Sequence, residues 1–172
     1  NKKKIKKNDL ILAIPSNGLH SNGFSLVRHI IKKKKINIKK NSFLKKELIK
    51  PTKIYTKEVL KIVDKNLIKS AAHITGGGLV ENILRSVPDK LCINIDLSKI
   101  KVKKIFKWIK KYNVTDQEML KTFNCGVGFC LIVDKKKVKK ITKYFPRDYK
   151  PYQIGSISKS IKKINLYNNI GW

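Results

Sequence analysis

Residues 70–85 read SAAHITGGGLVENILR, and this stretch decides the fold class. Its first six residues predict a short buried strand, three consecutive glycines then turn the chain, and apolar residues at helical spacing begin at Leu79. Residues 9–35 repeat this order of strand, glycine-containing loop and helix. Strands and helices that alternate in this way indicate an α/β sheet with helices packed on it.

The same patterns predict the remaining elements and their grouping. A Lys- and Asn-rich stretch ending at Ser42 predicts a surface loop, and a short helical piece follows it. A chain of this length can bury one good core, so we expect one domain at 9–166, after a lysine-rich lead-in at 1–8 and before a tail at 167–172. Strands are predicted at 9–15, 70–75, 91–96, 126–133, 153–158 and 161–166, and helices at 23–35, from Pro51-Thr52 through Val63, after Gly78, and at 102–112, 115–120 and 135–144.

The chain is strongly basic, with 41 Lys and Arg against 11 Asp and Glu and a formal net charge of +30. Only Arg28, Arg85 and Arg147 are arginine, whereas proteins that read phosphates and bases favour the bidentate guanidinium group. The lysines are spread along the whole length among Ile and Asn, all residues of A- and T-rich codons. We therefore expect salt-sensitive, nonspecific attraction to polyanions and no specific nucleic-acid partner, with a lysine-rich nucleic-acid-binding module as a less favoured alternative.

The cysteine and hydropathy patterns indicate in which cellular compartment we expect the protein. Cys92, Cys125 and Cys130 are odd in number and form no CxxC pair, which predicts free buried thiols rather than a zinc site or a disulfide framework. No apolar run approaches the roughly 20 residues of a membrane span, and the lysine-rich start lacks the apolar core of a signal peptide. We expect no membrane partner and a cytoplasmic location.

Glycines and small polar residues gather in three distant segments, at 18–28, 75–85 and 123–128. Glycine lets the backbone approach a ligand closely, and the free amides that begin a helix attract phosphate. The triplet at 76–78 matches neither the dinucleotide fingerprint nor the phosphate loop with Lys-Ser/Thr, so a tight turn without a ligand fits it equally well. Behind it, Asn82 and Arg85 share one helix face, where Arg85 either meets an anion or is an ordinary surface side chain.

Two of the three histidines lie in or beside these segments. His20 sits in a polar, glycine-flanked loop and is a candidate general acid, general base or hydrogen-bond donor to phosphate. His73 precedes the triplet inside an apolar strand, where a core histidine is the favoured interpretation. Asn124 can present its amide to a ligand, and glycines after it leave room for close approach. No metal centre or nucleophile triad is predicted, because no suitable spacing of ligands exists.

Five motifs carry a resemblance to one family across most of residues 9–160. They are GLHSNGFSLVR (18–28), PTKIY (51–55), AHITGGG (72–78) with Glu81, Asn82 and Arg85, Ile105-Phe106 with Trp108, and Glu118-Met119 with TFNCGVG (122–128). In this order they resemble the phosphoribosylformylglycinamidine cyclo-ligases, also called aminoimidazole ribonucleotide synthetases. Selenophosphate synthetase, thiamine-monophosphate kinase and formylglycinamidine ribonucleotide synthetase are related alternatives that lack several of these motifs.

The resemblance implies a fold and a reaction. It implies that the chain corresponds to the C-terminal half of an enzyme about twice as long, with a three-layer α/β/α domain and a mixed sheet. The reaction implied is ring closure of formylglycinamidine ribonucleotide in purine synthesis, in which ATP phosphorylates the formyl oxygen and the amidine nitrogen displaces phosphate. ATP and Mg²⁺ are the implied cofactors, with the Mg²⁺ ligands mainly in an N-terminal half that also forms a homodimer.

The resemblance also implies roles for individual residues. His20 and His73 are expected at the active cleft, with His20 as the donor or acid at a developing charge. The three glycine-containing segments are expected to form walls of a single cleft. Contacts with substrate or phosphate are expected from Ser21, Asn22, Gly23, Thr75, Gly76, Gly77, Gly78, Asn82, Arg85, Asn124 and Gly126.

Overall fold

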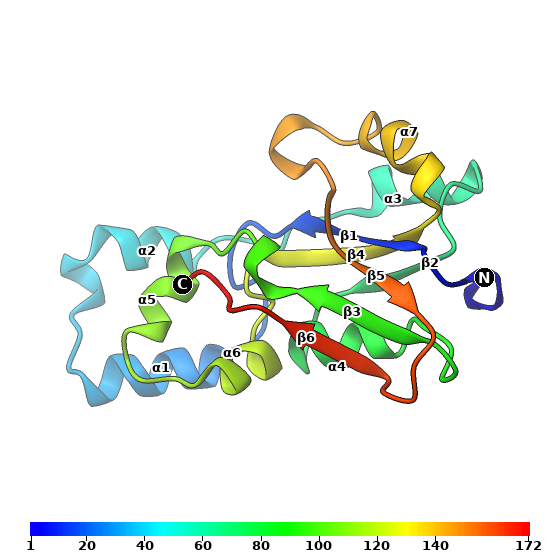
Figure 1. The fold of residues 1–172 in the computed structure, drawn as a ribbon. Helices are drawn as coiled ribbons and strands as arrows, with labels where there is room; N and C mark the ends of the chain where they lie inside the picture. Colours follow the sequence, from blue (N-terminus) through cyan, green and yellow to red (C-terminus); the bar gives the residue numbers. More distant parts are fainter.

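Strand β1 (Leu10–Pro15) runs through the sheet and alternates between its two faces. Ile11 and Ala13 belong to one buried apolar cluster, whereas Leu12 and Ile14 belong to another. A strand that is apolar on both faces requires cover on both. The computed structural model describes all of residues 1–172 and has this arrangement (Figure 1).

The sheet has six strands in the order β2-β4-β1-β5-β3-β6. Neighbouring strands are antiparallel except β3 and β6, which are parallel, so the sheet is mixed as the resemblance implies. The strands that join β1 are β2 (Ser70–His73), β3 (Cys92–Asp96), β4 (Val127–Val133), β5 (Tyr152–Ser158) and β6 (Ile164–Tyr167).

Helices cover both faces of the sheet, which confirms the three-layer prediction. Figure 1 shows α3 (Thr56–Asp64) and α7 (Val138–Thr142) on one face, over a cluster of nine buried residues. The other face holds a larger cluster of 31 buried residues, so most of the apolar burial lies there. The helices that contribute to it are α1 (Phe24–Lys33), α2 (Ser42–Leu48), α4 (Gly78–Leu84), α5 (Lys104–Lys110) and α6 (Asp116–Thr122).

The helix predicted to start at Pro51-Thr52 starts instead at Thr56, so that prediction was wrong for residues 51–55. The periodicity counted Ile54 as part of an apolar helix face, but its side chain is 75 % exposed. Tyr55 is only 5 % exposed, and its hydroxyl donates a hydrogen bond to the Pro15 carbonyl. This tertiary contact holds the segment in a non-helical path.

Other boundaries also differ from the predictions, and β2 ends at His73 rather than at Thr75. The last strand begins at Ile164 rather than Ile161, because Ile161 is fully exposed and Ile164 pairs with Ile93 of β3. The helix expected at 135–144 is a 3₁₀ turn at Lys135–Lys137 followed by α7. The capped turn at Thr115 is confirmed, since its side chain accepts a hydrogen bond from the Glu118 amide.

The two end segments pack against the domain. Ile5 of the lead-in is 6 % exposed and Ile170 of the tail is 5 % exposed, and both join the larger apolar cluster. The Trp172 indole donates a hydrogen bond to Asp116 at the start of α6.

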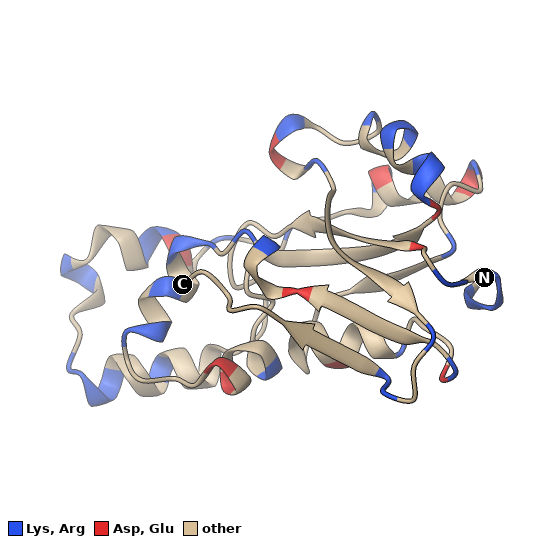
Figure 2. Ribbon diagram, viewed as in Figure 1, with Lys and Arg blue, Asp and Glu red and all other residues tan.

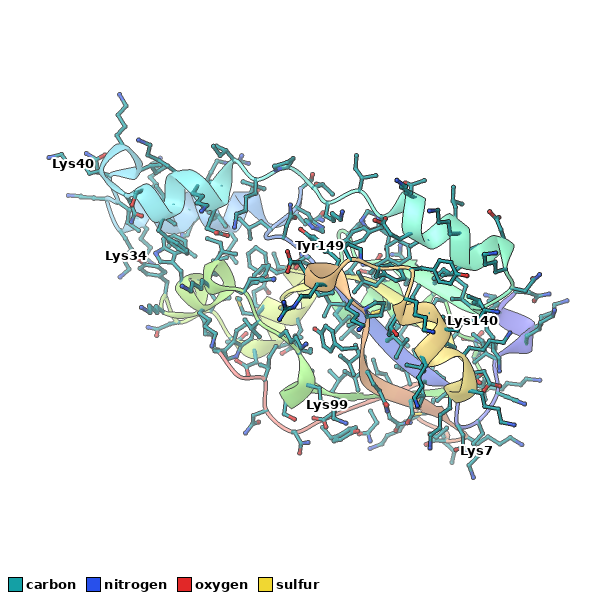
Figure 3. All side chains as sticks on the ribbon, turned by 90° about the horizontal axis from the view of Figure 1, so that it is seen from above. Lys7, Lys34, Lys40, Lys99, Lys140 and Tyr149 are labelled. Carbon is teal, nitrogen blue, oxygen red and sulfur yellow. The ribbon has the colours of Figure 1, made fainter.

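Lysine and arginine lie on the helices other than α4, on the 3₁₀ turns and in the loops, whereas the six strands contain none (Figure 2). Figure 3 shows Lys34 and Lys40 at one end of the molecule and Lys7 at the other. All three cysteines are buried, as predicted. None of the helices combines the length and apolar character that crossing a membrane requires.

Candidate active site

The side chain of Asn124 joins two of the three glycine-containing segments. Its oxygen accepts hydrogen bonds from the Ser16 hydroxyl at 2.9 Å and the Gly126 amide at 2.8 Å. Its nitrogen donates to the carbonyls of Gly18 at 2.9 Å and Leu19 at 3.3 Å. The side chain is buried, and its hydrogen bonds go to the loop before His20 and to Gly126 of its own segment. The amide is therefore turned into the fold, and this differs from the expectation that it faces a ligand.

Gly23 brings the same two segments into van der Waals contact. Its φ is +76°, and a Cβ there would lie 2.0 Å from the ring of Phe123. Gly23 also precedes α1, which has no side-chain cap, so the first amides of this ten-residue helix are free of side-chain partners. A groove of about 600 Å³ adjoins this helix start, lined by residues 20–25, Arg28 and residues 50–52. Its hydroxyls, free amides and two cationic side chains suit a phosphate group.

His20 lies at the base of this groove in an unusual environment. Its backbone has a φ of +58°, and its side chain is 5 % exposed. Neither ring nitrogen has a hydrogen-bond partner within the protein. Buried polar atoms without partners are rare and often mark functional groups. Burial and, to a smaller extent, the nearby His73 lower the pKa of His20 to about 4, so its ring is neutral at pH 7.

His73 is exposed at the end of β2, which contradicts the interpretation of a core histidine. Its ring stacks on Phe129 of β4 with 5.4 Å between centroids. Partial desolvation lowers its pKa. It borders an apolar hollow of about 400 Å³, lined also by Tyr55, Val59 and Leu60, and Thr52 lines both this hollow and the groove at His20.

The Thr75–Gly78 turn is held by Asn82. The Asn82 nitrogen donates to the carbonyls of Gly76 at 3.0 Å and Gly78 at 2.7 Å, and its oxygen accepts from the Thr75 hydroxyl. Asn82 therefore shapes the turn from within, while its contact with substrate stays a prediction. Gly76 is exposed, and a Cβ there would meet only Asn22, at 3.8 Å. The first and second segments thus adjoin each other at these two residues.

The other glycines and Arg85 have local structural partners. A Cβ at Gly78 would lie 2.0 Å from the Leu120 carbonyl, and one at Gly126 would lie 2.5 Å from the Lys101 carbonyl. A Cβ at Gly77 would collide with Glu81, which forms an ion pair with Arg85 on the exposed side of α4. These partners account for the glycines without a ligand, so their phosphate contacts remain predictions.

The structure brings the three segments into contact, but the first and second open onto separate hollows and residues 123–128 line neither of these. His20, Ser21, Asn22 and Gly23 line the groove at α1, while Gly77 borders a hollow of about 540 Å³ between α4 and α6. The single cleft expected from the sequence is divided within this chain.

Some residues of this region were not among the candidates from the sequence. Lys50 and Thr52 complete the groove, and the Thr52 hydroxyl lies 3.0 Å from that of Ser21. Tyr55 and Phe129 surround the two histidines. Thr52 and Tyr55 belong to the PTKIY motif. This motif contributed to the family resemblance, but the sequence assigned no functional role to its residues.

The neutral His20 ring predicts a loss of stability in mild acid. Its pKa is 6.5 in the unfolded chain and about 4 when folded, so the unfolded chain binds more protons between these values. The free energy of unfolding should fall as the pH drops from 6.5 to 4, by about 1–2 kcal/mol after allowance for solvent screening. Urea unfolding across this range, for the parent and for His20→Asn, measures it. The variant should show a flatter profile, and an unchanged profile would contradict this account of His20.

Comparisons with known proteins agree with these motifs. The family model described as "AIR synthase related protein, C-terminal domain" matches residues 6–164. The phosphoribosylformylglycinamidine cyclo-ligase of Prochlorococcus marinus (MED4) is 47% identical over 148 residues, covering 82% of this chain and 43% of that protein. The enzyme of the same name from Streptococcus pyogenes is 39% identical over 161 residues, covering 91% of this chain and 47% of that protein.

Solved structures with low sequence identity share the fold. The E. coli hydrogenase maturation protein HypE has a TM-score of 0.63 at 14% identity, covering 96% of this chain and 48% of HypE. A structure described as "AaThiL complexed with AMPPCP and TMP" has a TM-score of 0.57 at 12% identity, covering 98% of this chain and 52% of that one.

The chain spans about half the length of the cyclo-ligases it matches. The family model covers nearly the whole chain, and two relatives exceed 30% identity over more than two thirds of it. The chain therefore belongs to the family of AIR synthase related proteins, as their C-terminal domain.

Proposed function

We propose that this chain is the C-terminal half of a phosphoribosylformylglycinamidine cyclo-ligase. The observation that carries the proposal is a contrast in identity. Over the matched residues, relatives named cyclo-ligase are 39% and 47% identical to the chain, whereas the HypE and ThiL structures are only 14% and 12% identical. A fold shared at such low identity does not specify the reaction, so the closer relatives guide the assignment.

The proposed reaction closes an imidazole ring at the expense of ATP. The formyl oxygen of formylglycinamidine ribonucleotide attacks the γ-phosphorus, and ADP leaves. The amidine nitrogen then bonds to the formyl carbon, the C–O bond breaks, and phosphate departs with that oxygen. Loss of a proton gives aminoimidazole ribonucleotide. Such an enzyme acts mainly by positioning the reactants and neutralising charge.

The groove at α1 is the proposed phosphate-binding surface of this chain. Arg28 supplies positive charge there, Lys50 does so while ion-paired with Glu47, and the hydroxyls of Ser21 and Thr52 supply hydrogen bonds. The AMPPCP in the ThiL complex supports ATP as the nucleotide. We assign further contacts with substrate or phosphate to the loop residues near this groove, namely Asn22, Gly23, Thr75, Gly76, Gly77 and Gly78.

His20 is the proposed donor at the reacting oxygen. A neutral imidazole has one N–H donor and one acceptor nitrogen, and in His20 both are free of protein partners. Its lowered pKa keeps it neutral, so it acts as a hydrogen-bond donor rather than as a cationic acid. His73, exposed at the neighbouring hollow, is proposed to approach the substrate from the other side.

We propose that Mg²⁺ is held mainly by the part of the protein that the relatives carry beyond the matched span. Within this chain, no three His, Cys, Asp or Glu side chains lie close enough together to hold a metal ion. The same outer part is the proposed site of homodimer contacts. A cytoplasmic location is proposed to follow from the family's role in purine synthesis.

A fused enzyme tests the assignment. The segment of the Prochlorococcus marinus relative that precedes the matched span would be joined to this chain, giving a protein that we call the fused cyclo-ligase. We expect formylglycinamidine ribonucleotide and ATP to yield aminoimidazole ribonucleotide and ADP in equal amounts, at a rate within about tenfold of the parent relative, because the chain is 47% identical to the segment it replaces. Product is measured by mass spectrometry and ADP by a coupled assay.

Controls separate the alternatives. The parent relative is the positive control, and this chain by itself should form product far more slowly. A folded fused protein that makes no aminoimidazole ribonucleotide, but phosphorylates thiamine monophosphate or activates selenide, would replace the proposal with another enzyme of the superfamily. Tight, sequence-dependent DNA binding by the chain would favour the nucleic-acid alternative.

A further inference from the structure

Tyr55 belongs to the PTKIY motif, yet the proposed reaction assigns it nothing. It follows the irregular stretch that separates α2 from α3, and its side chain is buried. The hydroxyl donates a 2.9 Å hydrogen bond to the Pro15 carbonyl at the end of β1. The ring is thus fixed at one end to the strand that leads into the His20 loop.

The ring of Tyr55 lies between the two proposed catalytic histidines. Its centroid is 6.1 Å from that of His20, with the planes tilted by 57°, and 6.0 Å from that of His73, edge-on at 67°. It also packs against Phe129 at 5.5 Å. The spacings and tilts are those of favourable aromatic contacts. One side chain therefore contacts two histidines that are 53 residues apart in the chain.

Gly128 of β4 makes the space for this arrangement. A Cβ at this position would lie 1.8 Å from the Tyr55 hydroxyl oxygen and 3.0 Å from Cε1 of His20. The missing side chain leaves a volume that the tyrosine hydroxyl fills and the histidine ring borders. The third glycine-containing segment therefore accommodates both rings at once.

We propose that Tyr55 is a positioning residue that sets the orientation of His20 and His73 relative to each other. It acts through packing and through its anchor on Pro15, and it does not touch the reacting atoms. Burial raises the pKa of Tyr55, so its hydroxyl stays protonated and adds no charge beside the histidines. The catalytic consequence rests on the proposed function, whereas the placement of the histidines does not.

Histidine NMR spectra of this chain test the placement directly. The chain has three histidines, so the ¹H–¹³Cε1 spectrum has three signals, and the exposed His29 on α1 is an internal reference. In Tyr55→Leu we expect both the His20 and His73 signals to shift. The pKa of His20 should rise toward 6.5 as water reaches the ring. The NMR signal of His29 should not move. Tyr55 is the titratable side chain that packs against the His20 ring, and His73 acts on it electrostatically.

Tyr152→Leu is the matched control. Tyr152 on β5 is partly buried, and its hydroxyl accepts a hydrogen bond from the Lys101 backbone amide. Its loss should leave the His20 and His73 signals unchanged. Tyr55→Phe keeps the ring and removes only the anchor, so a smaller shift of the same two signals is expected even if Tyr55→Leu does not fold. If Tyr55→Leu folds and its His20 and His73 signals are unchanged, the proposal is overturned. If Tyr55→Leu does not fold, unchanged signals in Tyr55→Phe overturn it instead.

Kinetics of the fused cyclo-ligase then test the consequence. Tyr55→Leu should lower kcat about tenfold or more and change KM less than threefold, since substrate still binds but meets misplaced histidines. Tyr55→Phe should recover most of kcat. If the parent fused protein has no cyclo-ligase activity, the proposed function fails while the NMR result still decides the role of Tyr55. If kcat is unchanged but the signals move, the catalytic consequence is wrong.

Discussion

His20→Asn in the fused cyclo-ligase should lower kcat by about 10²- to 10⁴-fold, the usual effect of losing a positioned proton donor or acceptor. Asparagine is the suitable replacement because it adopts the positive φ of this position more readily than alanine does. The fold should therefore persist. Steady-state rates give kcat, and circular dichroism with urea unfolding checks the structure.

A matched control for this substitution exists in the same loop-helix unit. His29→Asn makes the same histidine-to-asparagine change on the exposed face of α1, at a residue that does not line the groove. This variant should retain at least half of the parent kcat. A near-normal kcat for His20→Asn would remove His20 from the mechanism. Equal losses in both variants would point to damage of α1 rather than to chemistry.

Asn124→Asp should lower the free energy of unfolding by about 3–5 kcal/mol, the cost of an uncompensated buried charge. The carboxylate can still accept from Ser16 and Gly126, but it cannot donate to the carbonyls of Gly18 and Leu19. A negative charge would face two carbonyl oxygens in a site that is 1 % exposed. Urea unfolding at pH 7.5 measures the loss, and the loss should shrink at lower pH as the carboxyl becomes protonated.

Asn41→Asp controls for the chemical change alone. Asn41 caps α2 with its side-chain oxygen, which accepts from the Leu44 amide, and aspartate caps helices equally well. Its effect should stay within about 0.5 kcal/mol. A similarly small effect for Asn124→Asp would show that the loop before His20 does not depend on this amide.

Much of the fold was predictable because its signals are local. The buried run at 10–15 predicts β1, and the Thr115 side chain caps its own helix. The strand predicted before the glycine triplet is also present as β2, although it ends at His73 rather than at Thr75. These patterns depend on neighbours a few residues apart. The order of the strands was not predicted, since pairing of β1 with β4 joins residues more than 100 positions apart. Only the mixed character of the sheet followed from the family resemblance.

The features that sequence patterns missed are set by contacts between distant residues. Tyr55 interrupts an apparent helix because it reaches Pro15, 40 residues earlier. Asn124 turns inward because Ser16, 108 residues away, meets its amide. His73 looked like a core residue from its apolar neighbours, but its strand is at the edge of the sheet and its ring remains exposed. Composition and periodicity give no information about contacts between residues that are distant in the sequence.

The Asn124 hydrogen bonds have a consequence for how a ligand would bind. All four of their partners belong to this chain, so the loop that holds His20 is shaped before any nucleotide or second domain arrives. A preorganised loop spares the entropy of ordering it on binding. Association with a phosphate compound should then resemble docking to a rigid surface, with little change in backbone flexibility of the loop.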